Sequence, residues 1–310
     1  MRYPLHPMSP GPSTEGLRND ALRAALTTAL AGRTAPLEDL LSRHGGYGTR
    51  PNLRLAAAFG AELATLPGTV APLLDHLGAN DAAPDTPQVF LPVAAAHGWV
   101  GRLRADREVG PAWDALVLLA GDERMPVRLG TLDALASFAR AKGGGALVGR
   151  ARQWLELEDR EICFGAAGVV IEVFADRQVL AALDDPTPLL DYLSRAIAAV
   201  ADAPRAAERS DARRRLLLAL PKTLRAVVVG FATAHRGTTW LENECRNARH
   251  PDLRAALSDT ILALGDKSSG QGAALAQQLR AVLEGSAKPP RDPTRKRPGA
   301  ARGKTSRPMR

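Results

Sequence analysis

The side chains best suited to binding or chemistry in this sequence form two groups of basic residues. Guanidinium and ammonium groups bind phosphate and carboxylate oxygens, so such groups predict contact with a polyanion or an acidic partner. In the first group, Lys222 and Arg225 follow Arg214 by eight and eleven positions, which would place all three on one face of a helix. A solvated face, partly paired with Glu208 and Asp211, is the alternative. The predicted binding residues are Arg213, Arg214, Arg215, Lys222, Arg225, Arg295, Lys296 and Arg297.

The second group belongs to a strongly basic carboxyl-terminal segment. Residues 285–310 contain nine Lys and Arg against a single acid, Asp292, and so carry a net charge of +8. The whole chain also carries +8, with 41 basic and 33 acidic residues, which leaves 32 of each sign before residue 285. The Pro, Gly, Ser, Lys and Arg composition of the segment cannot bury a core, so we predict a disordered tail. Its attraction to nucleic acid would be non-specific and salt-dependent, and a solubilising tail without a partner is the alternative.

Motifs of the common enzyme classes are missing or incomplete. Residues 144–149 followed by Arg150 resemble a phosphate-binding loop, but the required Lys and Ser or Thr are replaced and no strand is predicted before them. The six histidines are scattered without an HExxH motif, and Cys163 and Cys245 form no CxxC pair. Cys163 lies in an apolar segment and is expected to be buried, whereas Cys245 lies between charged residues and could be exposed. We therefore predict neither a metal nor a cofactor, and a protein that is not an enzyme.

The apolar segments predict neither a membrane span nor an export signal. Hydrophobic runs reach only about seven residues, far from the roughly 20 that cross a bilayer. Residues 1–16 contain four prolines and no apolar core, so they do not resemble a secretory signal. Two cysteines without a disulfide pattern fit a reducing compartment, and we predict a cytoplasmic protein.

A series of short amphipathic helices is expected to position the basic residues. The clearest has apolar or small residues at positions 253, 256, 257, 260, 261 and 264, which form one helical face. Segments 70–77, 113–120 and 147–155 repeat the pattern. The β-branched runs 169–171 and 227–229 could form strands, but both lie inside longer segments of helical period, and we predict helix for them.

Three of these predicted helices begin alike. Each has Pro near the first turn, where its missing N–H costs nothing, then an apolar residue and then Arg. The three starts are Pro51-Asn52-Leu53-Arg54, Pro126-Val127-Arg128 and Pro251-Asp252-Leu253-Arg254. Seven positions after each Arg come Ala61, Leu135 and Ile261, which we expect on the core face. The arginine spacings of 74 and 126 are close to multiples of a helical-pair repeat of roughly 40 residues.

The pattern over 121–134 and over 250–263 resembles HEAT repeats, and the whole chain resembles bacterial HEAT-repeat proteins without an assigned activity. The resemblance spans roughly Leu37 to Gly265, with Leu275 to Leu283 as a candidate cap. It implies an all-α fold, a right-handed α-α superhelix of the armadillo type with about five to six helical hairpins. It also implies that Arg54, Arg128 and Arg254 support the stacking of repeats by pairing with turn carboxylates. The expected organisation is a disordered Pro-rich start over 1–16, a HEAT-like body over 17–284 and the basic tail over 285–310.

This architecture predicts a scaffold that binds another macromolecule, with a protein favoured, on its concave surface, and the tail would add weak attachment to polyanions. The alternative is a DNA-binding or DNA-repair protein, because some alkylpurine DNA glycosylases are HEAT-like solenoids with Trp and a catalytic Asp in a concave groove. Trp113 and Asp114 form the only adjacent pair of these residues, although Trp113 also fits the core face of its helix. A third alternative is an assembly subunit that associates through an exposed helix.

Overall fold

The protein is all-helical in the part that the structure describes. The computed structural model describes residues 19–48, 50–231, 236–265 and 270–286, and within these ranges it contains fifteen α-helices and no strand. The predicted all-α fold class is therefore confirmed for these residues. The α-helices are α1 (Asn19–Leu30), α2 (Ala35–Gly45), α3 (Leu53–Thr65), α4 (Ala71–Gly78), α5 (Phe90–Arg104), α6 (Val109–Gly121), α7 (Met125–Lys142), α8 (Gly144–Trp154), α9 (Arg160–Val173), α10 (Arg177–Ala181), α11 (Thr187–Ala201), α12 (Asp211–Gly230), α13 (Arg236–Asn247), α14 (Pro251–Gly265) and α15 (Gly270–Gly285), and the 3₁₀ segments are η2 (Pro87–Val89) and η3 (Ala207–Arg209).

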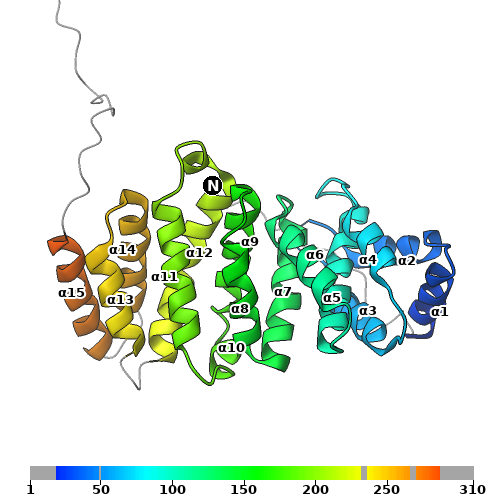
Figure 1. Cartoon of the computed structure of the whole chain (residues 1–310), viewed down its shortest axis with the longest axis horizontal. Helices are drawn as coiled ribbons and strands as arrows, with labels where there is room; N and C mark the ends of the chain where they lie inside the picture. The colour runs from blue at the N-terminus through cyan, green and yellow to red at the C-terminus, as the bar shows by residue number, and fades with distance from the viewer. Residues whose placement is uncertain (1–18, 49, 232–235, 266–269, 287–310) are drawn as a thin grey trace, which may run out of the picture.

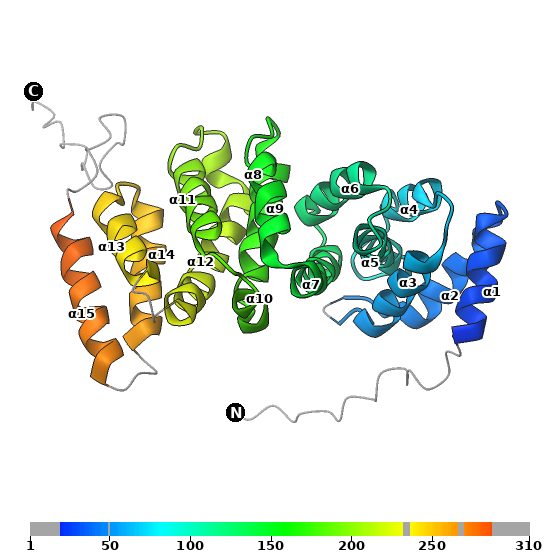
Figure 2. The same ribbon diagram turned by 60° about the horizontal axis from the view of Figure 1, so that its bottom comes forward.

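The helices follow one another along the long axis of the molecule, from α1 at one end to α15 at the other (Figure 1). Six of them, α3, α5, α7, α9, α12 and α14, each contact the next in that order. We call this set the continuous row. Helices α4, α6, α8, α11, α13 and α15 pack beside it, with contacts from α4 to α6, from α8 to α11 and from α13 to α15 (Figure 2).

The helical period of the sequence determines which residues form the core. All six positions predicted for one face of α14, from Leu253 to Leu264, are buried. The β-branched runs 169–171 and 227–229 lie inside α9 and α12, which confirms the helix prediction for both. No helix in the described ranges is both long enough and apolar enough to span a membrane.

Some helices of the continuous row approach each other through glycine. A Cβ on Gly60 of α3 would lie 2.3 Å from the carbonyl oxygen of His97 in α5, and a Cβ on Gly101 would lie 2.1 Å from the carbonyl oxygen of Gly60. Because real Cβ atoms do not approach oxygen so closely, the packing of α3 on α5 requires glycine at both positions. Helices α6 and α9 meet similarly, with Gly165 against the backbone of Gly121.

One expectation about the core face changes in the structure. Ala61 is exposed rather than on the core face, whereas Leu135 and Ile261 are buried as expected. Helix α8 begins at Gly144, and Gly143, with a φ of +82°, forms the turn between α7 and α8. The predicted disordered start and nearly all of the basic tail, including Arg295, Lys296 and Arg297, lie outside the described residues.

Candidate binding surface

Helix α12 carries the predicted basic group and begins with an ordinary cap. The side chain of Ser210 accepts a hydrogen bond from the backbone N–H of Arg213 at 3.0 Å, and Asp211 adds an acid to the first turn. Both features stabilise the positive end of the helix. The helix then continues to Gly230 with Pro221 in its interior. It packs between α9 and α14 in the continuous row.

Arg213 does not face solvent. Its side chain is only 2% exposed and forms an ion pair with Asp252 at the start of α14, with 2.9 Å between Nη1 and Oδ2. The same guanidinium donates hydrogen bonds to the carbonyl oxygens of Val200 and Glu208. It therefore ties α11, η3 and α14 to α12, and its donors are directed into the protein.

The other four basic residues of this group are at least partly exposed on α12. Arg214 forms an ion pair with Asp211, and Arg215 is half-buried. Lys222 is exposed, and Arg225 is half-buried. The structure thus separates one internal arginine from four residues that can reach a partner.

Three cations and one carboxylate gather where α7, α9 and α12 meet. Burial raises the pKa of Glu172 on α9, while the charges of Lys222 and Arg128 oppose that rise. Burial also lowers the pKa of Arg128 on α7, and the nearby charge of Arg215 lowers it further, while the carboxylates of Asp122 and Glu172 oppose this decrease. We call Arg128, Glu172, Arg215 and Lys222 the basic cluster. Its net charge is positive, which favours carboxylates or phosphates at this surface.

An exposed leucine lies within this basic cluster. Leu218 is 74% exposed and is three residues from Arg215 and four from Lys222, so all three share one helical face. Val229, at the end of the same helix, is 60% exposed. Leu218 thus offers an apolar contact flanked by the positive charges of Arg215 and Lys222.

Other arginines are used inside the protein to join consecutive helices. Arg102 is 1% exposed, and its guanidinium contacts Glu108 at 2.6 Å and the carbonyl oxygens of Leu63, Leu66 and Gly68. In this way α5 holds the loop that follows α3. No sequence pattern indicates this role of Arg102, because three of its partners are backbone carbonyl groups.

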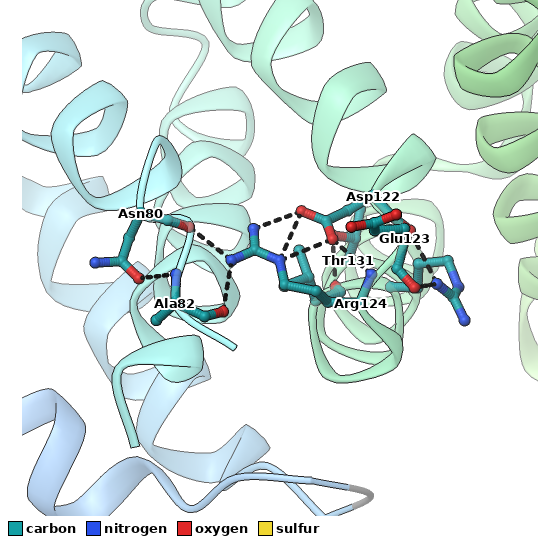
Figure 3. Close-up of polar contacts among 8 residues, drawn as sticks. Asn80, Ala82, Asp122, Glu123, Arg124 and Thr131 are labelled. Atoms are coloured by element: carbon teal, nitrogen blue, oxygen red, sulfur yellow. Dashed lines mark hydrogen bonds and ion pairs between the residues drawn. The ribbon is translucent and has the colours of Figure 1, made fainter. Parts of the chain in front are cut away.

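Arg124 forms a second such contact at the start of α7. Its Nη1 donates to the carbonyl oxygens of Asn80 and Ala82 at 2.7 and 3.1 Å, and its Nε and Nη2 contact the carboxylate of Asp122 (Figure 3). The loop after α4 is thereby joined to the turn between α6 and α7. Arg124 was also missed in the sequence, since it precedes the repeated Pro-apolar-Arg pattern by two positions.

The three arginines of the repeated pattern differ in their surroundings. Arg128 donates to the carbonyl oxygens of Asp122 and Glu123 in its own turn. Arg254 donates to the carbonyl oxygens of Ala248 and Leu283 and to the hydroxyl of Ser286. Arg54 is exposed. Arg128 and Arg254 thus make internal contacts, but with carbonyl oxygens and one hydroxyl, so the expected pairing with turn carboxylates is not seen in the contacts of either residue.

Trp113 is buried in the core rather than placed in an open groove. It packs edge to face against Phe138 and Trp154, with ring centroids at 5.2 and 6.0 Å, and Arg150 lies over its ring. Trp113 is 5% exposed, while Asp114 points to solvent. The adjacent pair is therefore not arranged to stack on a base and activate water at one place.

Neither cysteine is placed as a nucleophile. Cys163 is buried as expected. Cys245 is also buried, because it lies on the same inward face of α13 as Leu241. Burial raises the pKa of both thiols, that of Cys245 to about 11. Both are therefore uncharged thiols at neutral pH. No group of three or more potential metal ligands occurs in the part of the chain that the structure describes.

Comparisons with known proteins returned no match, since no family model, no curated protein and no solved structure is similar to this chain at a significant level.

Proposed function

We propose that this chain is a HEAT-type α-solenoid of about five to six helical hairpins that binds a protein partner on its concave surface. The succession of contacts from α3 to α14 supports this architecture, because each helix of the continuous row touches its neighbours in the row. Such proteins present one extended surface made by many short helices. The partner would be met in the cytoplasm, with the basic tail adding weak attachment to polyanions.

The exposed leucine within the basic cluster is the observation that carries the proposal. Leu218 provides apolar area at the centre of the contact, and Arg215 and Lys222 select carboxylates around it. The expected partner is an acidic protein surface or segment with an apolar side chain among its carboxylates. Buried arginines such as Arg102 and Arg213 stabilise the scaffold, whereas Arg215 and Lys222 are at least partly exposed and can contact a partner.

Site-specific photocrosslinking tests this proposal in the full-length protein. A photoreactive residue at position 218 should capture one acidic protein in cells, and the same residue at position 118 should not. Leu118 is a matched control because it is 57% exposed on α6, outside the continuous row.

The captured protein is then purified and its affinity measured by calorimetry. We expect Leu218→Glu to weaken binding by about tenfold or more, because a carboxylate would repel an acidic partner, while Leu118→Glu leaves it unchanged. Equal losses in both variants, or none in either, would refute the assignment of this surface.

A DNA-binding or DNA-repair function remains the second candidate, and the exposed Arg214 and Lys222 are the observation that favours it. Fluorescence anisotropy with labelled duplex and single-stranded DNA separates the two functions. We expect full-length protein to bind DNA and a chain ending at Ser286 to lose that binding, because the tail holds the excess charge. Binding by the shortened chain with a steep salt dependence would instead support a DNA-binding surface on α12.

A further inference from the structure

Three consecutive turns of the molecule form a strongly acidic surface. They lead into α5, α7 and α9 of the continuous row and span residues 79–89, 121–124 and 155–161. Together they contain eight carboxylates and two arginines, so their net charge is −6. We call these three turns the acidic edge. Its acidic residues are Asp81, Asp85, Asp122, Glu123, Glu156, Glu158, Asp159 and Glu161.

Direct contacts hold the three turns beside one another. Arg124 of the second turn donates to the carbonyl oxygens of Asn80 and Ala82 in the first turn, at 2.7 and 3.1 Å (Figure 3). A Cβ on Gly121 would lie 3.0 Å from the Cα of Ile162, so the second turn also touches the start of α9. The acidic edge is therefore one continuous surface along one side of the row.

Helix capping accounts for only part of this negative charge. The side chain of Asp159 accepts hydrogen bonds from the backbone N–H groups of Glu161 and Ile162 at the start of α9. The first turns of α5 and α7 contain no acidic residue. Among the residues that the structure describes, only Asp122 of the edge forms an ion pair, with Arg124. The other seven carboxylates of the edge are exposed and can attract a cationic partner.

The basic carboxyl-terminal segment leaves the helices on this same side of the row. Arg254, in the first turn of α14, donates to the hydroxyl of Ser286 and to the carbonyl oxygen of Leu283. The chain beyond Ser286 therefore begins beside the start of α14. The start of α12 lies there too, because Arg213 forms an ion pair with Asp252.

Helix α9 begins on the same side as α12, because the two helices run in the same direction. A Cβ on Gly168 would lie 3.5 Å from the Cα of Leu216, and the hydroxyl of Thr223 donates to the carbonyl oxygen of Ile171 at 2.9 Å. Residue numbers thus rise together along α9 and α12. The starts of α14, α12 and α9 therefore lead from Ser286 to the acidic edge.

The segment 287–310 matches the acidic edge in charge and in length. It contains nine basic residues and one acid, so it carries +8 against the −6 of the edge. Neighbouring helices lie about 10 Å apart, which places the edge about 20–40 Å from Ser286. A segment of 24 residues extends to about 80 Å. Because it is covalently attached, its effective concentration at the edge would be in the millimolar range.

We propose that the acidic edge binds the basic segment 287–310 of the same chain. Its Lys and Arg side chains would meet the exposed carboxylates in many weak contacts that salt screens. A polyanion would have to compete with the edge for the segment, so the edge limits attachment to nucleic acid. This contact is independent of the surface on α12.

Zero-length crosslinking of the full-length protein tests this contact. A carbodiimide joins a carboxylate to a lysine amine only when the two groups meet. The lysines of the segment are Lys288, Lys296 and Lys304. At low salt we expect them to be joined to Glu156 or Glu158 in the monomeric fraction, at least about fivefold more often than to Asp184. Asp184 is also exposed but lies beyond the opposite end of α9.

The internal control for this reaction is the ion pair of Lys142 with Asp106, whose Nζ and Oδ2 atoms lie 2.8 Å apart. Formation of this product without any product between the segment and the edge would refute the proposal. Equal crosslinking to Asp184 and to the edge would also refute it. Products found only in a dimeric fraction would do the same, because the segment would then come from a second copy.

Charge-neutralising variants locate the contact on the acidic edge. The edge variant neutralises three exposed carboxylates of the edge and comprises Glu123→Gln, Glu156→Gln and Glu158→Gln. The control variant neutralises three exposed carboxylates elsewhere and comprises Asp75→Asn, Asp184→Asn and Asp259→Asn. Trypsin cleaves a segment that has left its binding surface, so we expect the edge variant to lose the segment at least about threefold faster than the control variant. Equal rates of cleavage in the two variants would overturn the assignment of this surface.

Discussion

Helices α3 and α14 begin with the same residue pattern but use it differently. In α14, Arg254 makes internal hydrogen bonds that reach the end of α15, and Ile261 is buried. In α3 the equivalent Arg54 and Ala61 are both exposed. The stabilising guanidinium at α3 comes instead from Arg102 on the neighbouring helix. A repeated motif therefore marks equivalent positions in sequence without giving them equivalent contacts.

The difference has a consequence for function. Because α3 meets α5 through glycine and presents alanine to solvent, it leaves an open groove beside His97. On α12, by contrast, the surface carries long side chains. Arg215 and Lys222 provide positive charge beside the exposed Leu218.

Loss of Arg102 should have the largest effect on stability. Arg102→Met would remove the ion-pair partner of Glu108 and the guanidinium that donates to three carbonyl oxygens, so we expect the free energy of unfolding to fall by about 3–5 kcal/mol. Urea denaturation measures this change. Arg104→Ala, at an exposed position of the same helix, should stay within about 0.5 kcal/mol. Similar losses for both would show that Arg102 does not hold the end of α3.

The neutral His97 should make stability depend on pH. Its folded pKa of about 4 lies below the unfolded value near 6.5, so the unfolded chain binds the proton first as pH falls. Stability should decline from about pH 6.5 down to about pH 4, by about 3 kcal/mol in total. Urea denaturation across this range should show a shallower decline in His97→Gln. Identical profiles would contradict a buried, neutral imidazole.

The close contact of α3 with α5 can be tested with one methyl group. Gly60→Ala would place a Cβ 2.3 Å from the carbonyl oxygen of His97, so the helices must separate, and we expect a loss of about 1–3 kcal/mol. Gly110→Ala is the matched control in α6, because no atom lies within 4 Å of its new Cβ. Thermal unfolding should show a lower Tm for Gly60→Ala and not for Gly110→Ala. An unchanged Tm for Gly60→Ala would mean that α3 and α5 are further apart than the structure shows.

The smallest expected effect directly compares the first and third of the three copies of the motif. Arg254→Ala removes donors from Ala248, Leu283 and Ser286, and should cost about 1–2 kcal/mol. Arg54→Ala should cost less than about 0.5 kcal/mol, since Arg54 is exposed. Chemical denaturation of both variants under the same conditions measures the two losses in the free energy of unfolding. Equal losses would mean that Arg54 and Arg254 contribute equally to stability, despite their different contacts.

Much of the local structure was predictable because it depends on near neighbours in the chain. Helical spacing of apolar residues placed the core of α14 correctly, and it correctly favoured helix for the valine runs in α9 and α12. The same reasoning placed Cys163 in the core. It failed for Ala61 and Cys245, because a small residue or a thiol fits either side of a helix and only the packing partner selects one.

The candidate sites needed the tertiary structure. Sequence alone determined the helical class, the neutral body with its basic tail, and the basic residues of α12. Only packing decided that Arg213 is internal while Lys222 is exposed, and that His97 lies beside Asp133, 36 positions away in sequence. The physical reason is that helical period depends on spacings of three and four residues, whereas burial and charge pairing depend on which distant helix lies alongside.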